Sequence, residues 1–213
     1  MNKIVLVGYS GHSFVVYDIF QSQNQQVIGY CDNETKENNP FNLSYFGSEN
    51  TEKALNCLLA NDFFISVGNN EIREKMYITL TKKIGKPPIS AIHNRSVVSK
   101  YAQLGNGVMV SMGAIINPFA QIGDGVICNT GCIVEHECLV GSFAHIAPGA
   151  VLAGNVIVGE KSFIGANSVV KQGIKIGNNV TIGAGTVVLK DVPDGATVVG
   201  NPGRIITKFN SIK

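Results

Sequence analysis

The hydrophobic positions between Val98 and Pro193 repeat every six residues. The first position of each six is a large aliphatic residue in fifteen of sixteen consecutive repeats and a cysteine in the other. The fifth position is small or β-branched, and the second is often glycine. Neither the period of 3.6 of a helix nor the period of 2 of a long strand accounts for this spacing.

A six-residue repeat of this kind predicts a parallel β-helix. Each six would form one short strand and a turn, and three sixes would close one triangular coil. The large aliphatic side chain would fill the interior, the small residue would lie near a corner, and glycine would permit the turn. Coils stacked at the strand spacing of about 4.8 Å would make a prism about 25 Å long, a little over five coils. Stacking would supply the core, because one coil cannot bury its own inner face.

The first part of the chain follows a different pattern, in which short apolar runs alternate with segments of helical periodicity. The expected buried strands are Lys3 to Gly8, Val27 to Cys31, Asp62 to Gly68 and Ile89 to Ile92. The expected helices are Phe14 to Gln21, Glu49 to Leu59 and Glu71 to Ile84, with a polar loop over residues 35–42. The break at Lys86-Pro87-Pro88 divides the chain into a βαβ domain, residues 1–88, and a β-helix with a short basic tail, residues 89–213. The first domain is half a Rossmann fold, which suits a mononucleotide.

The loop after the first strand has the composition of a phosphate-binding turn. It reads Gly8-Tyr9-Ser10-Gly11-His12-Ser13 between a strand and a helix, where backbone N–H groups and the helix dipole favour an anion. Asp32 follows the second strand, about twenty positions later, where an acidic residue holds a ribose or base in nucleotide-binding folds. The three-glycine fingerprint is absent, so a plain strand-to-helix turn remains the alternative.

Composition and charge narrow the class of protein. The chain has 213 residues and a net charge of +2. This small charge argues against an electrostatic field strong enough to attract nucleic acid or a membrane surface. It contains no apolar run of about 18 residues and no signal-peptide pattern at its start. Three of its five cysteines fall on inward positions of the repeat, and no paired spacing suggests disulfides. We therefore expect a reduced, cytoplasmic protein.

The densest polar cluster on the expected prism is Glu135-His136-Glu137, with His145 nine residues later. His136 occupies an outward position, and carboxylates beside an imidazole favour its proton-bound form, which suits a general base. The plainer alternatives are a surface histidine at His136 and a packed histidine at His145. A zinc site of three histidines is not expected, because only two of the four histidines lie on the prism body.

The repeat resembles that of the left-handed β-helix acyltransferases, which are trimers that bind acetyl-coenzyme A between subunits. Together with the βαβ domain it is similar to the bacterial nucleotide-sugar N-acetyltransferases of bacillosamine biosynthesis, and to their relatives, the sialic-acid O-acetyltransferases. The resemblance covers nearly the whole chain. The matching stretches are Tyr9 to His12, Asp62 to Arg73, Val134 to Cys138 and Ala153 to Val156.

This resemblance implies roles for individual residues. His136 matches the general base that takes a proton from the sugar amine, and Glu137 matches the residue that strengthens this base. His145, Ala166 and Ala184 match positions that contact acetyl-coenzyme A. The remaining matches concern the nucleotide. Ser10, Gly11 and His12 match the loop that holds the UDP diphosphate, and Asp32 and Asn33 match the pair that contacts uridine. Gly68 matches a glycine that lets the nucleotide approach the backbone closely. Asn33 stands where the family has an acidic residue.

The resemblance implies a metal-independent acetyltransferase acting on the 4-amino group of a UDP-4-amino-4,6-dideoxy-N-acetylhexosamine, with acetyl-coenzyme A as donor. The expected assembly is a homotrimer, with no nucleic acid and no membrane insertion. Binding energy from the nucleotide can orient the reacting amine. Two alternatives stay open: a sialic-acid or other sugar O-acetyltransferase, and a non-catalytic nucleotide-sugar-binding β-helix protein.

Overall fold

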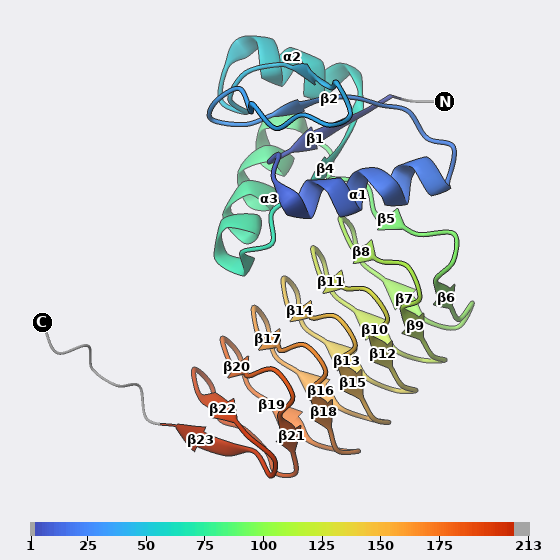
Figure 1. The fold of residues 1–213 in the computed structure, drawn as a ribbon, viewed down its shortest axis with the longest axis vertical. Coiled ribbons are helices and arrows are strands. Elements are labelled where there is room, and N and C mark those ends of the chain that lie inside the picture. Colours follow the sequence, from blue (N-terminus) through green and yellow to red (C-terminus); the bar gives the residue numbers. More distant parts are fainter. Residues whose placement is uncertain (1–2, 207–213) are drawn as a thin grey trace, which may run out of the picture.

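The computed structural model describes residues 3–206, which form a small sheet-and-helix unit joined to a long triangular prism (Figure 1). The N-terminal unit has a four-stranded parallel sheet in the order β3-β2-β1-β4. Its strands are β1 (Ile4–Val7), β2 (Val27–Cys31), β3 (Ser44–Tyr45) and β4 (Asp62–Ile65), and its helices are α1 (Gly11–Ser22), α2 (Glu52–Ala60) and α3 (Asn70–Ile84). In the part of the chain that the structure describes, no helix is both long and apolar enough to cross a membrane.

The prism is a left-handed β-helix whose three faces are parallel sheets of very short strands, as the six-residue period predicts. One face contains β5 (Ala91–Ile92), β8 (Met109–Val110), β11 (Ile127–Cys128), β14 (His145–Ile146), β17 (Phe163–Ile164), β20 (Thr181–Ile182), β22 (Thr197–Val199) and β23 (Arg204–Ile206). Within residues 3–206 this sheet has eight strands, and we call it the eight-stranded face. The last pairing on this face, β22 with β23, is antiparallel.

Within residues 3–206 the other two faces have six and five strands. The six-stranded face contains β6 (Val97–Val98), β9 (Ile115–Ile116), β12 (Ile133–Val134), β15 (Val151–Leu152), β18 (Val169–Val170) and β21 (Val187–Val188). The five-stranded face contains β7 (Gln103–Leu104), β10 (Gln121–Ile122), β13 (Leu139–Val140), β16 (Ile157–Val158) and β19 (Lys175–Ile176). Residues eighteen apart pair in register, as in Ile127 with His145 and His145 with Phe163.

The interior of the prism is built as the period predicts. The first and fifth positions of the sixes are buried along almost the whole prism, and they include Cys128, Cys132 and Cys138, all fully buried. Burial of this continuous aliphatic column provides the main stabilisation of the prism, at roughly 25 cal/mol for each Å² of apolar surface removed from water.

The role of the second-position glycines differs from the prediction. The positive φ angles of the turns fall on the fourth position in all sixes but the first and the last, including Phe119 (64°), Glu137 (61°) and Phe143 (60°). Glycines at the second position have no such angle. They are required because the next coil approaches too closely: a β-carbon on Gly141 would lie 2.7 Å from the backbone nitrogen of Glu160. These glycines therefore permit stacking of the coils, whereas the turn itself is made two residues later.

The N-terminal unit packs on the eight-stranded face. Val16, Ile19 and Phe20 of α1 form one buried cluster with Met109 and Ile127, which project outward from that face. In Figure 1 the unit covers one end of the prism, with α1 lying between the small sheet and the first coils. The six-stranded and five-stranded faces meet at the edge opposite the eight-stranded face, and this edge is therefore on the far side from the N-terminal unit.

The basic tail expected from Ile205 to Lys213 is described only as far as Ile206, as part of β23. Its residues 207–213 lie outside the described part of the chain.

Candidate active site

His136 and Glu137 form the turn between β12 and β13, on the edge where the six-stranded and five-stranded faces meet. Their side chains are 52% and 62% exposed, so the outward direction predicted for His136 is correct. Nδ1 of His136 lies 3.1 Å from Oε2 of Glu137. With the proton on Nδ1, this contact is a hydrogen bond to the carboxylate, and Nε2 keeps a free lone pair that can accept a proton.

The backbone holds this pair in place. Glu137 has a left-handed φ of 61°, and its N–H donates to the carbonyl of Pro118 in the preceding coil at 3.2 Å. The carbonyl of His136 accepts from the N–H of Asn155 in the following coil at 2.9 Å. Both residues are thus bonded to the rigid stack on either side, and only the side chains remain free to respond to a ligand.

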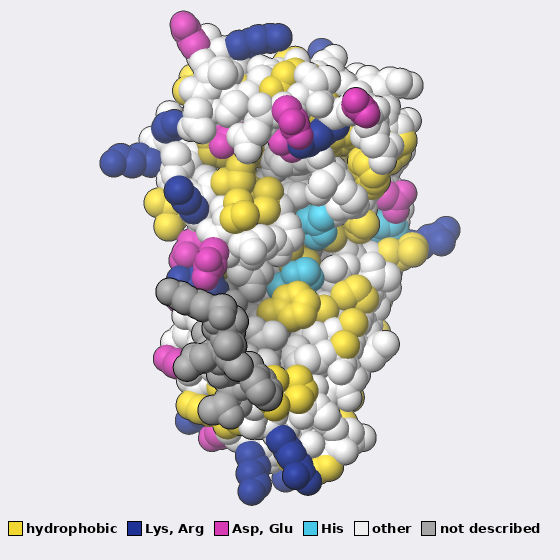
Figure 2. Space-filling view, turned by 60° about the vertical axis from the view of Figure 1, so that its left-hand side comes forward, with side chains coloured by type: hydrophobic (Ala, Val, Ile, Leu, Met, Phe, Trp, Pro, Cys, Tyr) yellow, Lys and Arg dark blue, Asp and Glu magenta, His cyan; other side chains and the backbone are white. Residues whose placement is uncertain are grey.

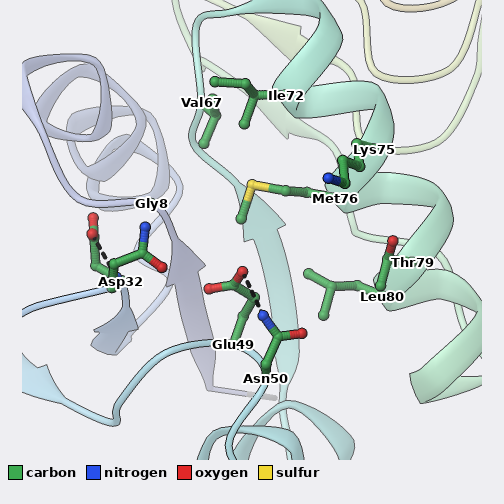
Figure 3. Close-up of a pocket in the computed structure, with 11 residues that line it drawn as sticks. Gly8, Asp32, Glu49, Asn50, Val67, Ile72, Lys75, Met76, Thr79 and Leu80 are labelled. Atoms are coloured by element: carbon green, nitrogen blue, oxygen red, sulfur yellow. Dashed lines mark hydrogen bonds between the residues drawn. The ribbon is translucent and has the colours of Figure 1, made fainter.

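A cavity of about 410 Å³ opens in the N-terminal unit, between the carboxyl ends of its strands and helix α3 (Figure 3). Gly8, Asp32 and Asn33 line one side. The other lining residues are Glu49, Asn50, Val67, Ile72, Lys75, Met76, Thr79 and Leu80. The carboxyl end of a parallel sheet is the usual place for a nucleotide, and the volume is typical of small-ligand sites.

Asp32 is tightly held at the edge of this cavity. One carboxylate oxygen accepts from the N–H of Tyr9 at 2.8 Å, and the other accepts from the N–H of Asn33 at 2.7 Å. Nζ of Lys36 lies 3.2 Å from the same carboxylate. Asp32 therefore connects the loop after β1 to the loop after β2, and the predicted pair Asp32 and Asn33 does share one cavity.

The predicted phosphate loop begins helix α1 three residues earlier than expected. Ser10 is the N-cap, Gly11 is the first helical residue, and the hydroxyl of Ser13 accepts from the N–H of Ser10 at 2.9 Å. Because α1 follows β1 after a short loop, its first amides lie at the carboxyl end of β1, where an anion site would need them. Ser10, Gly11 and His12 do not line the cavity that contains Asp32.

His12 belongs instead to a second group, with Gly68 and His145, where the N-terminal unit meets the prism. The ring centroids of His12 and His145 are 6.5 Å apart, and Figure 2 shows histidine side chains gathered at this junction. Gly68 lies against the His12 ring, since a β-carbon there would be 4.0 Å from its Cγ. Nε2 of His12 is buried without a hydrogen-bond partner among the described residues.

His145 is only 9% exposed and lies on the eight-stranded face. Its Nε2 is 3.2 Å from Nδ2 of Asn129 in the coil before, and its ring packs edge-on against Phe163 in the coil after. Burial first, and the nearby Arg73 cation second, lower the pKa of His145 to about 3 and that of His12 to about 4. Both rings are therefore neutral at pH 7.

Ala166 and Ala184 lie on the third edge of the prism, between the eight-stranded and six-stranded faces. They occupy the same turn position in successive coils, and the carbonyl of Ala166 accepts from the N–H of Gly185 at 2.8 Å. Ala166 is half-buried and Ala184 is exposed. Within one chain the predicted site residues therefore lie in three separate places. His136 and Glu137 lie on one edge of the prism, the nucleotide-binding residues of the N-terminal unit lie on the side of His145, and Ala166 and Ala184 lie on another edge.

Sequence reasoning missed several residues of this region. Glu49, Lys75 and Met76 line the nucleotide-side cavity, and Arg73 is buried at the junction near His12 and His145. In the sequence, the stretch Gly68 to Arg73 stood out only through its resemblance to the nucleotide-sugar acetyltransferases. Within residues 3–206, no three His, Cys, Asp or Glu side chains come together in a way that could hold a metal ion.

Comparisons with known proteins agree with this architecture. Residues 3–80 match the PglD N-terminal domain family, and residues 155–190 match the family described as hexapeptide repeat of succinyl-transferase. The acetyltransferase domain of PglB from Neisseria gonorrhoeae, solved with acetyl coenzyme A, is 34% identical, with a TM-score of 0.90 over 96% of this chain and 99% of that chain. The comparison with curated protein sequences gives no significant match.

Two further structures extend the comparison. PerB from Caulobacter crescentus, solved with CoA and GDP-perosamine, is 32% identical, with a TM-score of 0.89 over 97% of this chain and 98% of that chain. WeeI from Acinetobacter baumannii is 25% identical, with a TM-score of 0.76 over 95% of this chain and 99% of that chain. The fold and these relatives thus define an acetyl-CoA-dependent acyltransferase. The chain belongs to the left-handed β-helix family of sugar N-acetyltransferases.

Proposed function

We propose that this enzyme transfers the acetyl group of acetyl-CoA to the 4-amino group of a UDP-4-amino-4,6-dideoxy-N-acetylhexosamine. The product would be a UDP-2,4-diacetamido-2,4,6-trideoxyhexose. The observation that carries the proposal is the exposed imidazole of His136, tied through Nδ1 to Glu137. An amino group attacks only in its neutral form, so an acceptor for its proton is the group this reaction requires.

In the proposed reaction the amine nitrogen attacks the thioester carbonyl carbon, a C–N bond forms and the C–S bond breaks. Nε2 of His136 takes the proton that the nitrogen loses and passes it to the departing thiolate of CoA. Glu137 stabilises the imidazolium that exists between these two transfers. No covalent acyl-enzyme is needed, and the cysteines of the prism are buried inside it.

In the proposal residues 1–88 bind the nucleotide and residues 89–213 carry the transfer. The cavity at Gly8, Asp32 and Asn33 would hold the uridine end, and the amides at Ser10 to His12 would face the diphosphate. His145, Ala166 and Ala184 would contact acetyl-CoA. PerB supports the class of acceptor, since it was solved with a nucleotide amino sugar, also in variants with one histidine replaced by Asn or Ala.

A homotrimer completes the proposal. In one chain His136 lies on the edge opposite the eight-stranded face, whereas the N-terminal unit and His145 lie on that face. A base and an amine on opposite sides of a prism cannot react, so the site would form between neighbouring protomers. The free cysteines and the use of acetyl-CoA suit a cytoplasmic location, which we also propose.

The proposal is tested by a mass-spectrometric assay with acetyl-CoA and a panel of acceptors. The panel contains the UDP-linked 4-amino sugar, its GDP- and dTDP-linked counterparts, and free sialic acid. We expect a gain of one acetyl group on the UDP sugar, with a kcat/KM at least about tenfold above the other nucleotides. Turnover of sialic acid alone would replace this proposal with the O-acetyltransferase alternative. The non-catalytic alternative is set aside, because the chain belongs to a family of acetyltransferases.

A further inference from the structure

Arg73 is the largest fully buried side chain in the described part of the protein, at 2% exposure. It stands in the first turn of α3, where Asn69 caps the helix by accepting from the N–H of Ile72 at 3.0 Å. No ion pair among residues 3–206 includes it. A buried guanidinium without a carboxylate is costly unless all its donors are satisfied, so its contacts require an explanation.

All five N–H donors of Arg73 are used within the chain. Nη1 donates to the carbonyls of Val67 at 3.1 Å and Gly68 at 2.9 Å. Nε donates to the carbonyl of Gly125 at 2.7 Å. Nη2 donates to Oδ1 of Asn70 at 2.8 Å and to the carbonyl of Phe143 at 2.7 Å. No donor remains for a phosphate or a carboxylate of a substrate, which excludes a direct role in ligand binding.

The contacts on the prism follow a regular pattern. Gly125, Phe143 and Lys161 occupy the same turn position in three successive coils, on the edge between the five-stranded and eight-stranded faces. Arg73 bonds the first two, and Asn70 extends the series by donating from Nδ2 to the carbonyl of Lys161 at 2.9 Å. The first turn of α3 is thus fastened to three coils at once. We call this set of bonds the Arg73 clamp.

An ion pair reinforces the clamp one helical position further along. Nζ of Lys161 lies 3.1 Å from Oε2 of Glu74, and both side chains are about a quarter exposed. Exposed ion pairs contribute little to stability, so this pair is secondary to the buried bonds of Arg73. Hydrogen bonds from a charged donor are stronger than those from a neutral donor, and here they are fixed in direction by the planar fork.

The clamp controls the segment that lies between the two parts of the site. Val67 lines the nucleotide-side cavity, and Gly68 lies against His12 beside His145. Both carbonyls accept from Nη1 of Arg73. Arg73 therefore bonds the rim of the nucleotide cavity directly to the turns at the edge of the eight-stranded face, and it has no donor left for a ligand.

We propose that Arg73 is a positioning residue for acetyl transfer, which fixes the nucleotide-binding unit on the prism so that the acceptor amine is presented at one distance from the transferring groups. A misplacement of about 1 Å can cost about 10²-fold in rate. This inference rests on the proposed function for the identity of the acceptor only, because the clamp acts on whichever sugar nucleotide the N-terminal unit holds.

The test compares Arg73→Lys and Arg73→Met with the wild type, at a temperature where each variant is fully folded by circular dichroism. We expect kcat to fall about 10–100-fold in both variants. The Kd values for UDP alone and for acetyl-CoA alone should stay within about threefold of the wild type, because every donor of Arg73 is bonded within the chain and none is left for a ligand. Lysine should not rescue kcat, because one ammonium cannot reach five acceptors arranged around a planar fork.

Two further variants keep the test decisive. Asn70→Ala removes the bond to the third coil and one of the five acceptors of Arg73, and leaves the other four in place. It replaces the Arg73 variants if they do not fold, and a smaller fall in kcat, about threefold to tenfold, is expected. Lys82→Met removes an exposed cation from the last turn of the same helix and should leave kcat unchanged.

The outcomes separate this inference from the proposed function. If the wild type acetylates a GDP- or dTDP-linked amino sugar instead of the UDP sugar, the proposed acceptor is wrong, and the clamp is tested on the accepted sugar. An unchanged kcat in folded Arg73 variants overturns the positioning role. A weakening of UDP binding in proportion to the fall in kcat/KM overturns it too, because it shows a defect of the pocket itself.

Discussion

The imidazole of His136 rests on Gly154, which lies in the next coil of the prism. A β-carbon built on Gly154 would lie 2.6 Å from both Cε1 and Nε2 of the ring. Glycine is therefore required here by the space that the ring occupies, and not by the backbone, since φ of Gly154 is not in the left-handed region. The glycine leaves room for the Cε1–Nε2 side of the ring against the next coil, while Nδ1 contacts Glu137.

Replacement of Gly154 by alanine should therefore displace the ring without disturbing the coil. We expect kcat/KM to fall about tenfold or more, while the melting temperature stays nearly unchanged. A double-mutant cycle with His136→Ala provides the control, because two groups in contact have non-additive effects. Once the ring is absent, Gly154→Ala should cost nothing further in kcat/KM. Additive losses would show that the alanine acts on the coil rather than on the ring.

His136 and Glu137 should differ in the size of their effects. His136→Ala removes the proposed proton acceptor and should lower kcat/KM at pH 7 by about 10²-fold or more. Glu137→Gln keeps a hydrogen-bond acceptor for Nδ1 but removes the negative charge, so a smaller loss of about tenfold is expected. Steady-state kinetics with acetyl-CoA in excess would measure both. A loss well short of 10²-fold for His136→Ala would reject its role as base.

Two inactive variants should restore activity to each other if the site lies between protomers. Asp32→Ala impairs the nucleotide side, and His136→Ala removes the base. In trimers assembled at random from equal amounts of both, about a quarter of the sites combine an intact base with an intact nucleotide cavity from the neighbour. Co-refolding followed by the acetyl-transfer assay would measure this. No recovered activity in mixed trimers would place the whole site within one protomer.

Acid should destabilise the protein through His12 and His145. Their folded-state pKa values, about 4 and about 3, lie below the ordinary value of 6.5. Below pH 6.5 the unfolded chain binds protons that the folded chain does not, so the free energy of unfolding falls as pH is lowered toward these values. At pH 5 the loss relative to pH 7 should be about 2 kcal/mol for each histidine.

Urea unfolding at pH 7, 6 and 5 would measure this effect. In His145→Gln the slope of the free energy of unfolding against pH should decrease by about 1.2 kcal/mol per pH unit between pH 6 and pH 5. His12→Gln should have a similar effect. Curves parallel to that of the wild type would show that these rings take up protons in the folded state as readily as in the unfolded chain.

The sequence was sufficient to predict the prism, because the same physical demand recurs at every coil. An inward position must be apolar in each six, and sixteen repetitions make the pattern unmistakable. The outward direction of His136 followed from the same count. Strand β2 was also predicted with its observed bounds, since a continuous apolar run from Val27 to Cys31 has no competing interpretation.

Other features left no such pattern in the sequence. The acceptors of Arg73 on the prism are backbone carbonyls 52 to 70 residues away, and a carbonyl has the same chemistry at every residue. Helix α1 begins at Gly11 rather than Phe14, because Ser10 caps the helix before its apolar face begins. Strand β3 was missed, because Ser44–Tyr45 is only two residues long and depends on pairing with β2.

The in-register stacking of the coils also limits how a site on this scaffold can change. Side chains on one edge are separated by whole coils, so a base can move along the axis only in steps of about 4.8 Å. Insertion or deletion of eighteen residues would shift everything beyond it by one such step and leave each side chain facing the same direction. Preference for shorter or longer acceptors would therefore evolve on this scaffold in jumps, with no gradual intermediates.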